Sequence, residues 1–244
     1  MLKKIINFIS GKTSLIYLVS EEEERVEKMV ASAAQKAPGG PLHLYIWSCL
    51  YGLTRGKESL EKTTDLTAAL GTFMRIKEPS LLVCKDLHLF LNGAPQLVRQ
   101  LKDTARVLRS SRNKIFFVCP YLNLPQELYS IFKIEDVPLP AYEELERILE
   151  ACIREEPAAE SLRQSLDGDI RDKMVRAAMG FTVNEAQDAF HAALMNRTTV
   201  TGDAVDIVLE QKQALVRKSG VLEFVSAQAG SWEIGGLVNL KKWL

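Results

Sequence analysis

The sequence predicts an α/β fold: a five-stranded, mostly parallel sheet with helices on both faces, followed by a small all-α lid domain. Short apolar runs alternate with helix-length intervals up to about residue 140, and only helical periodicity follows "VPLP" at 137–140. Such near-continuous apolar strands are typical of parallel sheets that are covered on both faces. We therefore expect an α/β domain at 1–140, a helical domain at 141–220, and a linker at 221–244 that ends on a new amphipathic pattern.

The alternation comes from five apolar runs and the intervals between them. The predicted strands are Leu15–Ser20, His43–Cys49, Leu81–Asp86, Ile115–Cys119 and Ile134–Val137. The intervals 21–37, 60–76 and 94–112 are each long enough for a helix, and 120–133 allows only a short one. Helical crossovers between strands place those strands parallel to one another.

Helical spacing dominates the second half of the chain. One predicted helix carries the apolar residues Leu145, Ile148, Leu149, Cys152 and Ile153. Thr182 and Glu185 form a capping-box signature ahead of another apolar face, made of Val183, Ala186, Ala189, Phe190, Ala193 and Leu194. A third predicted helix, about 202–218, carries Val205, Val208, Leu209 and Leu215 and ends before Gly220.

Composition gives no global argument for a nucleic-acid or membrane partner. The chain has 31 basic and 31 acidic residues, and 47% of its residues are hydrophobic, as in ordinary core-forming proteins. No apolar stretch approaches the length of a membrane span. The apolar run in the opening "MLKKIINFIS" is too short for a secretory signal. We expect a cytoplasmic protein.

The cysteines and histidines show no metal-binding or catalytic spacing. Cys49, Cys84, Cys119 and Cys152 form no C-x-x-C pair, and three of them lie in strand-like apolar runs. We expect buried thiols in a reducing compartment, with no disulfides and no metal. His43 and His88 each stand alone beside a strand end, where we expect satisfied polar groups and no metal ligand.

The tripeptide Gly11–Lys12–Thr13 matches the end of a phosphate-binding P-loop. The full pattern needs an earlier glycine, and that position is Ile6. A P-loop also follows a strand and enters a helix, whereas this tripeptide precedes the strand "SLIYLVS". We expect a turn that leads into the strand, and no phosphate site of the P-loop kind.

Several segments, taken in order, resemble AAA+ ATPase modules. "LLVCKDLH" lies where such modules carry the Walker B strand, "KIFFVCPYLNLPQEL" is similar to the sensor-1 strand, and "FKIEDVPLP" resembles the fifth strand. "MGFTVNEAQDAFHAAL" resembles a lid helix, and "WEIGGLVNLKKWL" resembles the start of a second AAA+ module. Together they are similar to a plastid and cyanobacterial AAA+ family, first known as a conserved chloroplast reading frame. In that family a degenerate amino-terminal module precedes an intact ATPase module.

The resemblance implies that this chain is the amino-terminal part of a roughly doubled protein. On that basis, residues 221–244 are a linker and the start of a truncated second module, whose catalytic residues lie beyond Leu244. It also places the nucleotide phosphates of an active module at the junction "YLVSEEEERVEK", where the first strand meets the following helix.

That junction has neither a glycine-rich loop nor a phosphate-binding lysine. In their place stand Ser20, Glu21, Glu22, Glu23 and Glu24. Ser20 and Glu23 match a capping box, which would use the N–H groups that a phosphate needs. A unit-charge repulsion at 4 Å costs about 1 kcal/mol in water and about 4 kcal/mol at an effective dielectric of 20. Glutamates in a first helical turn also stabilise the helix, which by itself explains their presence. The missing loop and the repulsion lead us to expect no cofactor in this chain.

The remaining positions implied by the resemblance also differ from an active ATPase. Asp86 matches the Walker B aspartate, but Leu87 stands where the water-polarising glutamate would be. We expect Asp86 to cap the following turn, with a weak metal contact as the alternative. Only Lys133 is available where AAA+ proteins place the arginine finger, and the lid segment "GFTVNEAQ" lacks a sensor-2 arginine.

A basic stripe follows the predicted helix at 94–112. It consists of Arg99, Lys102, Arg106 and Arg109, which span roughly 80° of the helix surface. Leu97, Val98, Leu101, Ala105 and Leu108 would pack the neighbouring face on the sheet. The stripe is either a solvated face or a docking surface. Because no aromatic residue interleaves with it, protein is a better candidate partner than single-stranded nucleic acid.

The sequence therefore favours a nucleotide-site-degenerate AAA+ module with a regulatory and protein-interaction role. Its expected partners are the downstream module, neighbouring subunits and an unidentified protein, with no membrane or nucleic acid. ATP and Mg are expected for the downstream module. Two alternatives remain: a divergent module that binds and slowly hydrolyses ATP, and a clamp-loader-like subunit that contacts DNA.

Overall fold

The computed structural model describes residues 1–219 of the chain. It contains two compact units, which divide between Leu139 and Pro140. The expected linker and second module at 221–244 lie outside the described residues. Within the described part, no helix is long and apolar enough to cross a membrane.

The first unit is built on a seven-stranded mixed sheet in the order β4-β3-β2-β5-β6-β1-β7. Its strands are β1 (Leu15–Val19), β2 (His43–Ser48), β3 (Gly52–Arg55), β4 (Glu58–Ser59), β5 (Ser80–Lys85), β6 (Lys114–Cys119) and β7 (Phe132–Asp136). The five strands β2, β5, β6, β1 and β7 run parallel, and β3 and β4 add an antiparallel hairpin at one edge.

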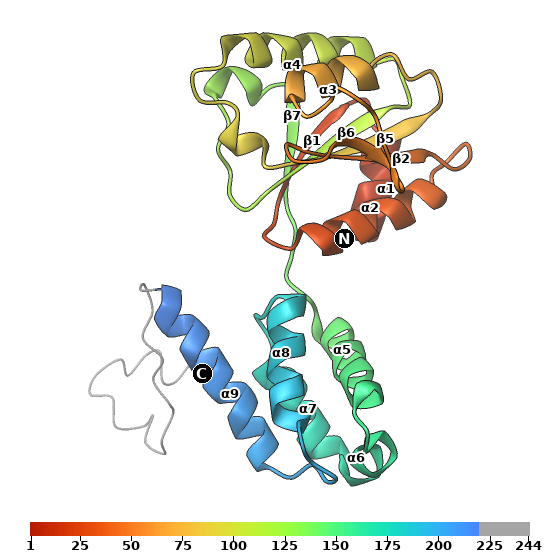
Figure 1. Ribbon diagram of the computed structural model, residues 1–244. Helices are drawn as coiled ribbons and strands as arrows, with labels where there is room; N and C mark the ends of the chain where they lie inside the picture. Colours follow the sequence, from red (N-terminus) through yellow and green to blue (C-terminus); the bar gives the residue numbers. More distant parts are fainter. Residues whose placement is uncertain (220–244) are drawn as a thin grey trace, which may run out of the picture. The chain divides into compact units, whose positions relative to one another are not determined.

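Helices cover both faces of this sheet. They are α1 (Leu2–Ser10), α2 (Glu23–Gln35), α3 (Leu66–Phe73) and α4 (Pro95–Leu108), with short 3₁₀ turns η1 (Leu87–Leu89) and η2 (Gln126–Leu128). Figure 1 shows α1 and α2 on one face and α3 and α4 on the other. The α/β class predicted from the sequence is confirmed, and each of the five predicted strands has its counterpart in the parallel core.

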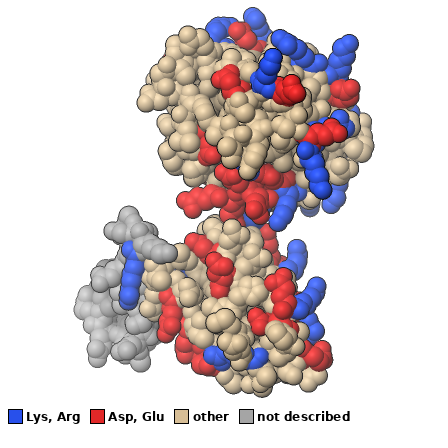
Figure 2. Space-filling view, viewed as in Figure 1, with Lys and Arg blue, Asp and Glu red and all other residues tan. Residues whose placement is uncertain are grey.

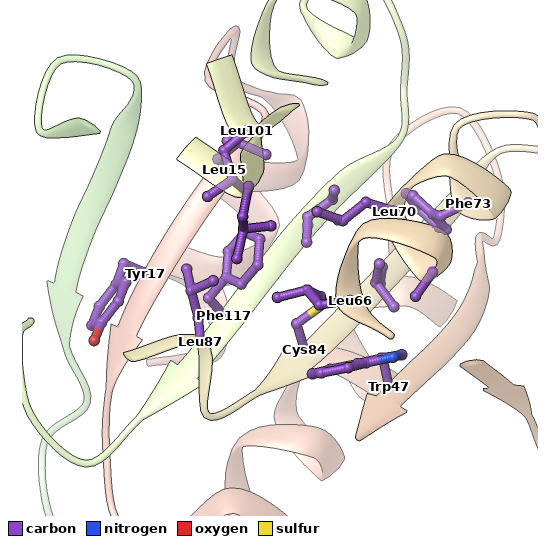
Figure 3. Packing of buried hydrophobic residues seen from close by; sticks show 14 of the residues in the cluster. Leu15, Tyr17, Trp47, Leu66, Leu70, Phe73, Cys84, Leu87, Leu101 and Phe117 are labelled. Carbon is purple, nitrogen blue, oxygen red and sulfur yellow. The ribbon is translucent and has the colours of Figure 1, made fainter. Parts of the chain in front are cut away.

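The alternating burial of the strands explains why they are apolar throughout. In β1, Leu15 and Tyr17 enter the core under α3 and α4, whereas Ile16 and Leu18 enter the core under α1 and α2. Figure 3 shows the first of these cores, with Trp47 at one end of it. The Trp47 Nε1–H donates to the carbonyl of Thr63 at 2.7 Å, so its one polar group is satisfied.

The predicted strand count of five was wrong, because the β3–β4 hairpin has a weak sequence signal. Its strands are only four and two residues long, and both β4 residues are exposed. Gly52 opens the hairpin at φ +70°, and a Cβ there would lie 2.6 Å from the Thr63 hydroxyl. Glycine is therefore required for both backbone and packing reasons.

Two further features were not anticipated from the sequence. The opening segment forms the helix α1, in which Ile5 and Ile9 are buried one turn apart. Cys49 is exposed because it follows the end of β2, whereas Cys84, Cys119 and Cys152 are buried. All four thiols are free.

The second unit is helical. Its helices are α5 (Tyr142–Glu155), α6 (Ala159–Ser165), α7 (Gly168–Ala177), α8 (Val183–Leu194) and α9 (Asp203–Ser219). The capping box predicted at Thr182 and Glu185 is confirmed, since each side chain accepts a hydrogen bond from the other residue's backbone N–H. Apolar residues from all five helices form one core.

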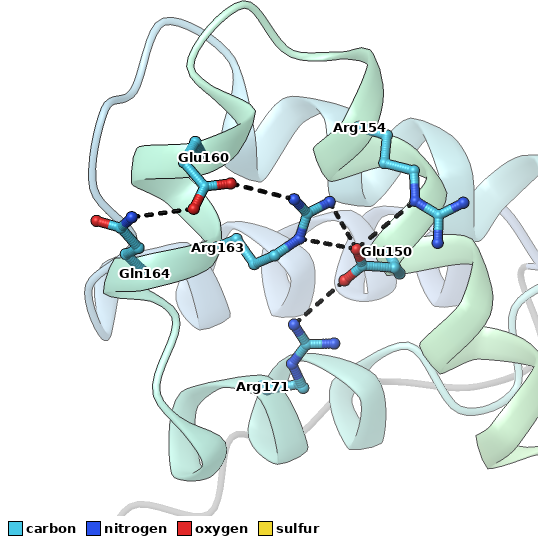
Figure 4. Close-up of polar contacts among 6 residues, drawn as sticks. All are labelled: Glu150, Arg154, Glu160, Arg163, Gln164 and Arg171. Carbon is cyan, nitrogen blue, oxygen red and sulfur yellow. Dashed lines mark hydrogen bonds and ion pairs between the residues drawn. The ribbon is translucent and has the colours of Figure 1, made fainter.

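An ion-pair cluster joins three helices of this unit at Glu150 (Figure 4). Arg163 on α6 donates twice to Oε1 of Glu150, at 3.0 Å from Nε and 2.7 Å from Nη2. Arg171 on α7 donates to Oε2 at 3.3 Å. Although partial burial would raise the pKa of the Glu150 carboxyl, these two arginines hold it below its usual value.

Candidate functional site

The Gly11–Lys12–Thr13 tripeptide forms the connection between α1 and β1. Gly11 ends α1, and its N–H donates to the carbonyl of Phe8 at 3.1 Å. Its carbonyl accepts a hydrogen bond from Nζ of the buried Lys114 at 2.8 Å. The tripeptide therefore lies at the amino-terminal end of β1, whereas α2 follows the carboxyl end of the strand.

The junction between β1 and α2 is short. Only three residues, Ser20 to Glu22, separate the end of β1 from the first residue of α2. No glycine occurs in the sequence between Gly11 and Gly39. The N–H of Ser20 donates to the carbonyl of Cys119 at 2.8 Å, which ties the start of the junction to the end of β6.

The capping box predicted for Ser20 and Glu23 is wrong. The helix begins later than expected, with Glu22 as its N-cap and no side-chain cap bond. The Ser20 hydroxyl accepts from the N–H of Glu22 at 3.1 Å, so it closes a local turn ahead of the helix. Because Glu23 is already the first helical residue, it lies too early to reach back to a cap at Ser20.

Two of the four glutamates are paired with basic side chains. Glu22 accepts from Arg25 at 2.7 Å, and Arg25 also donates to the carbonyl of Pro138 at 2.8 Å. Lys85, at the end of β5, lies 3.2 Å from Glu23 and 2.6 Å from Glu27. Burial alone would lower the pKa of Lys85, but these two carboxylates raise it overall.

Sequence reasoning missed Lys85, although it is the cation that the fold brings to this junction. It stands directly before Asp86, and β5 lies beside β6, which in turn pairs with β1. Only the strand order places it beside α2, so the sequence pattern alone could not reveal the contact. Glu21 and Glu24 are the two exposed glutamates of the group.

Asp86 and Leu87 follow β5 in a strained turn. Asp86 is one of three described non-glycine residues with positive φ, at 57°, and its carbonyl accepts from the N–H of Leu89 at 3.0 Å. Its side chain is 41% exposed and makes no cap bond, so the predicted side-chain cap of the following turn was wrong. Leu87 is fully buried in the core under α3 and α4.

The expectation of a satisfied polar group was wrong for His88, whose buried Nδ1 has no hydrogen-bond partner among the described residues. Nδ1 of His88 lies 3.9 Å from the Asp86 carboxylate, and the ring packs edge-on against Tyr121 at 4.8 Å between centroids. Nδ1 of His43 lies 2.9 Å from the Arg55 guanidinium. Among the described residues, no group of three or more His, Cys, Asp or Glu side chains is arranged to hold a metal ion.

The basic stripe lies on α4 and on Arg109, the C-cap residue of that helix. Figure 2 shows Lys and Arg side chains over the end of this unit where Figure 1 labels α4. The five predicted apolar residues of α4 pack against the core: Leu97, Val98, Leu101, Ala105 and Leu108. Arg99, Arg106 and Arg109 are exposed, and Lys102 is partly exposed. Sequence reasoning missed Asp103, which pairs with Arg99 and lies 3.4 Å from Arg106.

The Asp103 contacts could have been found from spacing. Asp103 stands four residues after Arg99 and three before Arg106, the separations at which helical side chains meet. The pKa of its carboxyl is lowered, chiefly by the hydrogen bond from Arg99. The stripe therefore presents four cations with one anion among them.

Parallel strands in the order β2-β5-β6-β1-β7, followed by a helical unit, define the AAA+ class of fold. Solved structures share this fold. The structure of C. elegans PCH-2 matches with a TM-score of 0.55 at 10% identity, covering 88% of this chain and 67% of that one. The FIGL-1 AAA domain in complex with ADP matches with a TM-score of 0.52 at 15% identity, covering 89% of this chain and 74% of that one. Domain III of the Thermotoga maritima replication initiation protein DnaA matches with a TM-score of 0.53 at 12% identity, covering 86% of this chain and 89% of that one. At these identities the likeness concerns the fold alone.

The chain belongs to the SpoVK-like AAA ATPase family. Its residues 1–137 match that family's N-terminal domain, and residues 143–219 match its second domain. The AAA domain-containing protein ycf46 of Guillardia theta is 27% identical over 240 residues, which cover 97% of this chain and 46% of that protein. The corresponding protein of Trieres chinensis is 23% identical over 244 residues, which cover 99% of this chain and 47% of that protein. The chain spans about half the length of these relatives.

Proposed function

We propose that this chain is the nucleotide-site-degenerate amino-terminal module of an AAA+ ATPase. It would act as a regulatory and protein-interaction domain for a catalytic AAA+ module downstream. The match to a domain described as N-terminal supports this position, as does the roughly doubled length of the relatives. ATP and Mg would then be cofactors of the downstream module, and this chain would need neither.

The β1–α2 junction carries the proposal. A P-loop wraps backbone N–H groups around the phosphates over a glycine-rich turn of eight residues or so. Three residues without a glycine cannot make that turn. No lysine of the junction itself is available to reach β- and γ-phosphates.

Electrostatics at the junction supports the same conclusion. Lys85 is the nearest strand-end cation, and Glu23 and Glu27 already neutralise it. Glu21 and Glu24 remain exposed there. A triphosphate would meet a repulsion of about 1–4 kcal/mol from each close carboxylate, with no phosphate-binding loop to offset it.

The side chains after β5 also support an inactive site. Hydrolysis needs a base or a polarising group within hydrogen-bond reach of the attacking water. Leu87 offers none and is buried, and Asp86 is turned into a left-handed backbone conformation beside His88. We assign Asp86 a structural role and no catalytic one.

Neutralising the exposed glutamates tests the proposal against the divergent-ATPase alternative. We expect the Glu21→Gln, Glu24→Gln chain to give the same Mg-ATP calorimetric isotherm and the same absence of ATP hydrolysis as the wild type. A Glu155→Gln, Glu160→Gln chain, with equal charge change in the helical unit, is the control. Tighter binding or measurable turnover in the junction variant alone would show that nucleotide approaches this junction.

A further inference from the structure

A cavity of about 430 Å³ lies at the opposite end of β1 from the α2 junction. The α1–β1 connection lines it with Lys12, and the α4–β6 connection lines it with Arg109, Ser110, Ser111, Arg112 and Lys114. Its volume falls within the roughly 300–1,000 Å³ range of small-molecule sites. It shares Arg109 with the basic stripe and Lys12 with the Gly11–Lys12–Thr13 tripeptide, and no function has been assigned above to the cavity itself.

The charge of the lining is one-sided. Four basic side chains and no carboxylate line the cavity. Among residues 1–219, none of these four basic groups forms an ion pair with a carboxylate. The helices α1 and α4 end here, and each carboxyl end offsets only about half a unit charge. Roughly three positive charges therefore remain without a counter-ion from the chain.

Lys114 contributes a charge that is held away from water. The residue is 2% exposed, and its Nζ donates to the Gly11 carbonyl at 2.8 Å. An ammonium group carries three donors, so two remain for another acceptor. Burial lowers the pKa of Lys114. A bound anion would favour the charged form again.

Hydroxyl donors complete the lining. The Ser111 hydroxyl oxygen accepts from the N–H of Asn113 at 2.9 Å, which leaves its own proton free to donate. Arg112 is fixed in place, because its guanidinium donates to the carbonyls of Pro38, Gly39 and Gly40 at 2.8–3.0 Å. Its charge is thus preorganised at the cavity and needs no further ordering.

We propose that this cavity binds a chain of phosphates, either free or as the triphosphate of a nucleotide. Several linked phosphates carry enough negative charge to match the lining, and their oxygens accept hydrogen bonds from its four basic side chains and from the Ser111 hydroxyl. The exposed Lys12 and Arg109 would contact the outer phosphates. Lys114 and Ser111 would contact the inner ones.

Calorimetry with tripolyphosphate and with ATP, both in EDTA without magnesium, tests the proposal on the full 244-residue chain. We expect submillimolar binding that weakens with added salt. A Lys12→Gln, Arg109→Gln chain should bind at least about tenfold more weakly, because two close unit charges are lost. A Lys102→Gln, Arg106→Gln chain removes the same charge from the face of α4 outside the cavity and should bind like the wild type.

The result also identifies the source of the phosphate. Equal affinities for tripolyphosphate and ATP would assign the site to the phosphate chain alone, and tighter ATP binding would assign it to a nucleotide. Absence of binding at 10 mM ligand would overturn the proposal. That concentration is on the order of a hundredfold above the KM of a typical enzyme for its substrate. Equal weakening by the two double variants would overturn it too. The Glu21→Gln, Glu24→Gln chain should bind as the wild type does, so failure here is separable from failure at the junction.

Discussion

At the scale of single residues, the contacts that the sequence could reveal are those set by local spacing. The Thr182–Glu185 capping box and the apolar face of α4 both follow from helical periodicity, and both were predicted. The Ser20–Glu23 box has the same spacing but does not form, because the β1–α2 turn delays the helix start. Lys85 meets Glu23 and Glu27 only through tertiary packing, which no local pattern encodes.

The substitution Leu87→Glu tests whether a glutamate after Asp86 can restore ATP hydrolysis. Leu87→Glu supplies the missing carboxylate, but the site is fully buried, so we expect a loss of about 3 kcal/mol or more of unfolding free energy and no ATP hydrolysis. Urea denaturation and an ATPase assay measure both. Leu89→Glu is the control, because Leu89 is 65% exposed and should tolerate the charge. Unchanged stability of Leu87→Glu would show that the position is not the buried one described.

At the scale of elements, the strands that could be predicted from the sequence are those buried on both faces of the sheet. The five parallel strands were found because both faces are covered, which makes them apolar throughout. The β3–β4 hairpin at the sheet edge was missed, since its strands are only four and two residues long and Leu53 is the one apolar residue in them. The helix α1 was missed although Leu2, Ile5, Ile6 and Ile9 recur at helical spacing, because nine residues are short for a helix prediction.

The Glu150 cluster makes the packing of α5, α6 and α7 depend on pH. The folded-state pKa of Glu150 lies below its unfolded value of 4.5, so its stabilising contribution is present above that pH and is lost as the pH falls below it. Glu150→Gln should destabilise the helical unit by about 1 kcal/mol at neutral pH. The difference from the wild type should shrink below about pH 4.5.

Thermal unfolding of the wild type and Glu150→Gln across pH 3 to 8 measures this effect. Glu160→Gln is a matched control, because the Glu160 side chain is 76% exposed and its nearest ion-pair distance is 3.6 Å. It should change stability little at any pH. A difference for Glu150→Gln that persists unchanged to pH 3 would contradict the ion-pair explanation.

At the scale of the whole molecule, the described residues form a fold with the layers of the AAA+ class, and we propose that its β1–α2 junction is where it departs from a nucleotide-binding module. The α/β unit has its sheet, its four covering helices and a following helical unit. Order and spacing of the segments sufficed to predict the family. The proposed regulatory role depends on the surface that such a module offers to its neighbours.

The basic stripe on α4 is the surface that we expect to contact a protein partner. Arg99→Glu, Arg106→Glu should weaken assembly of the full-length protein in sedimentation velocity, because it reverses charge on an exposed face. The melting temperature should stay unchanged, since exposed ion pairs contribute little to stability. Arg154→Glu, Lys173→Glu in the helical unit is the charge-matched control. Assembly equal to that of the wild type would rule out the stripe as a docking surface.

The central claim is that the β1–α2 junction does not bind nucleotide. Its most direct test is a calorimetric titration of Mg-ATP into the Lys12→Gln, Arg109→Gln chain, which retains every residue of the junction and weakens the basic cavity. We predict no micromolar binding of Mg-ATP by this variant, and at most the residual millimolar binding of the weakened cavity. Micromolar binding in this variant would contradict the claim and would mean that the junction holds nucleotide without a P-loop.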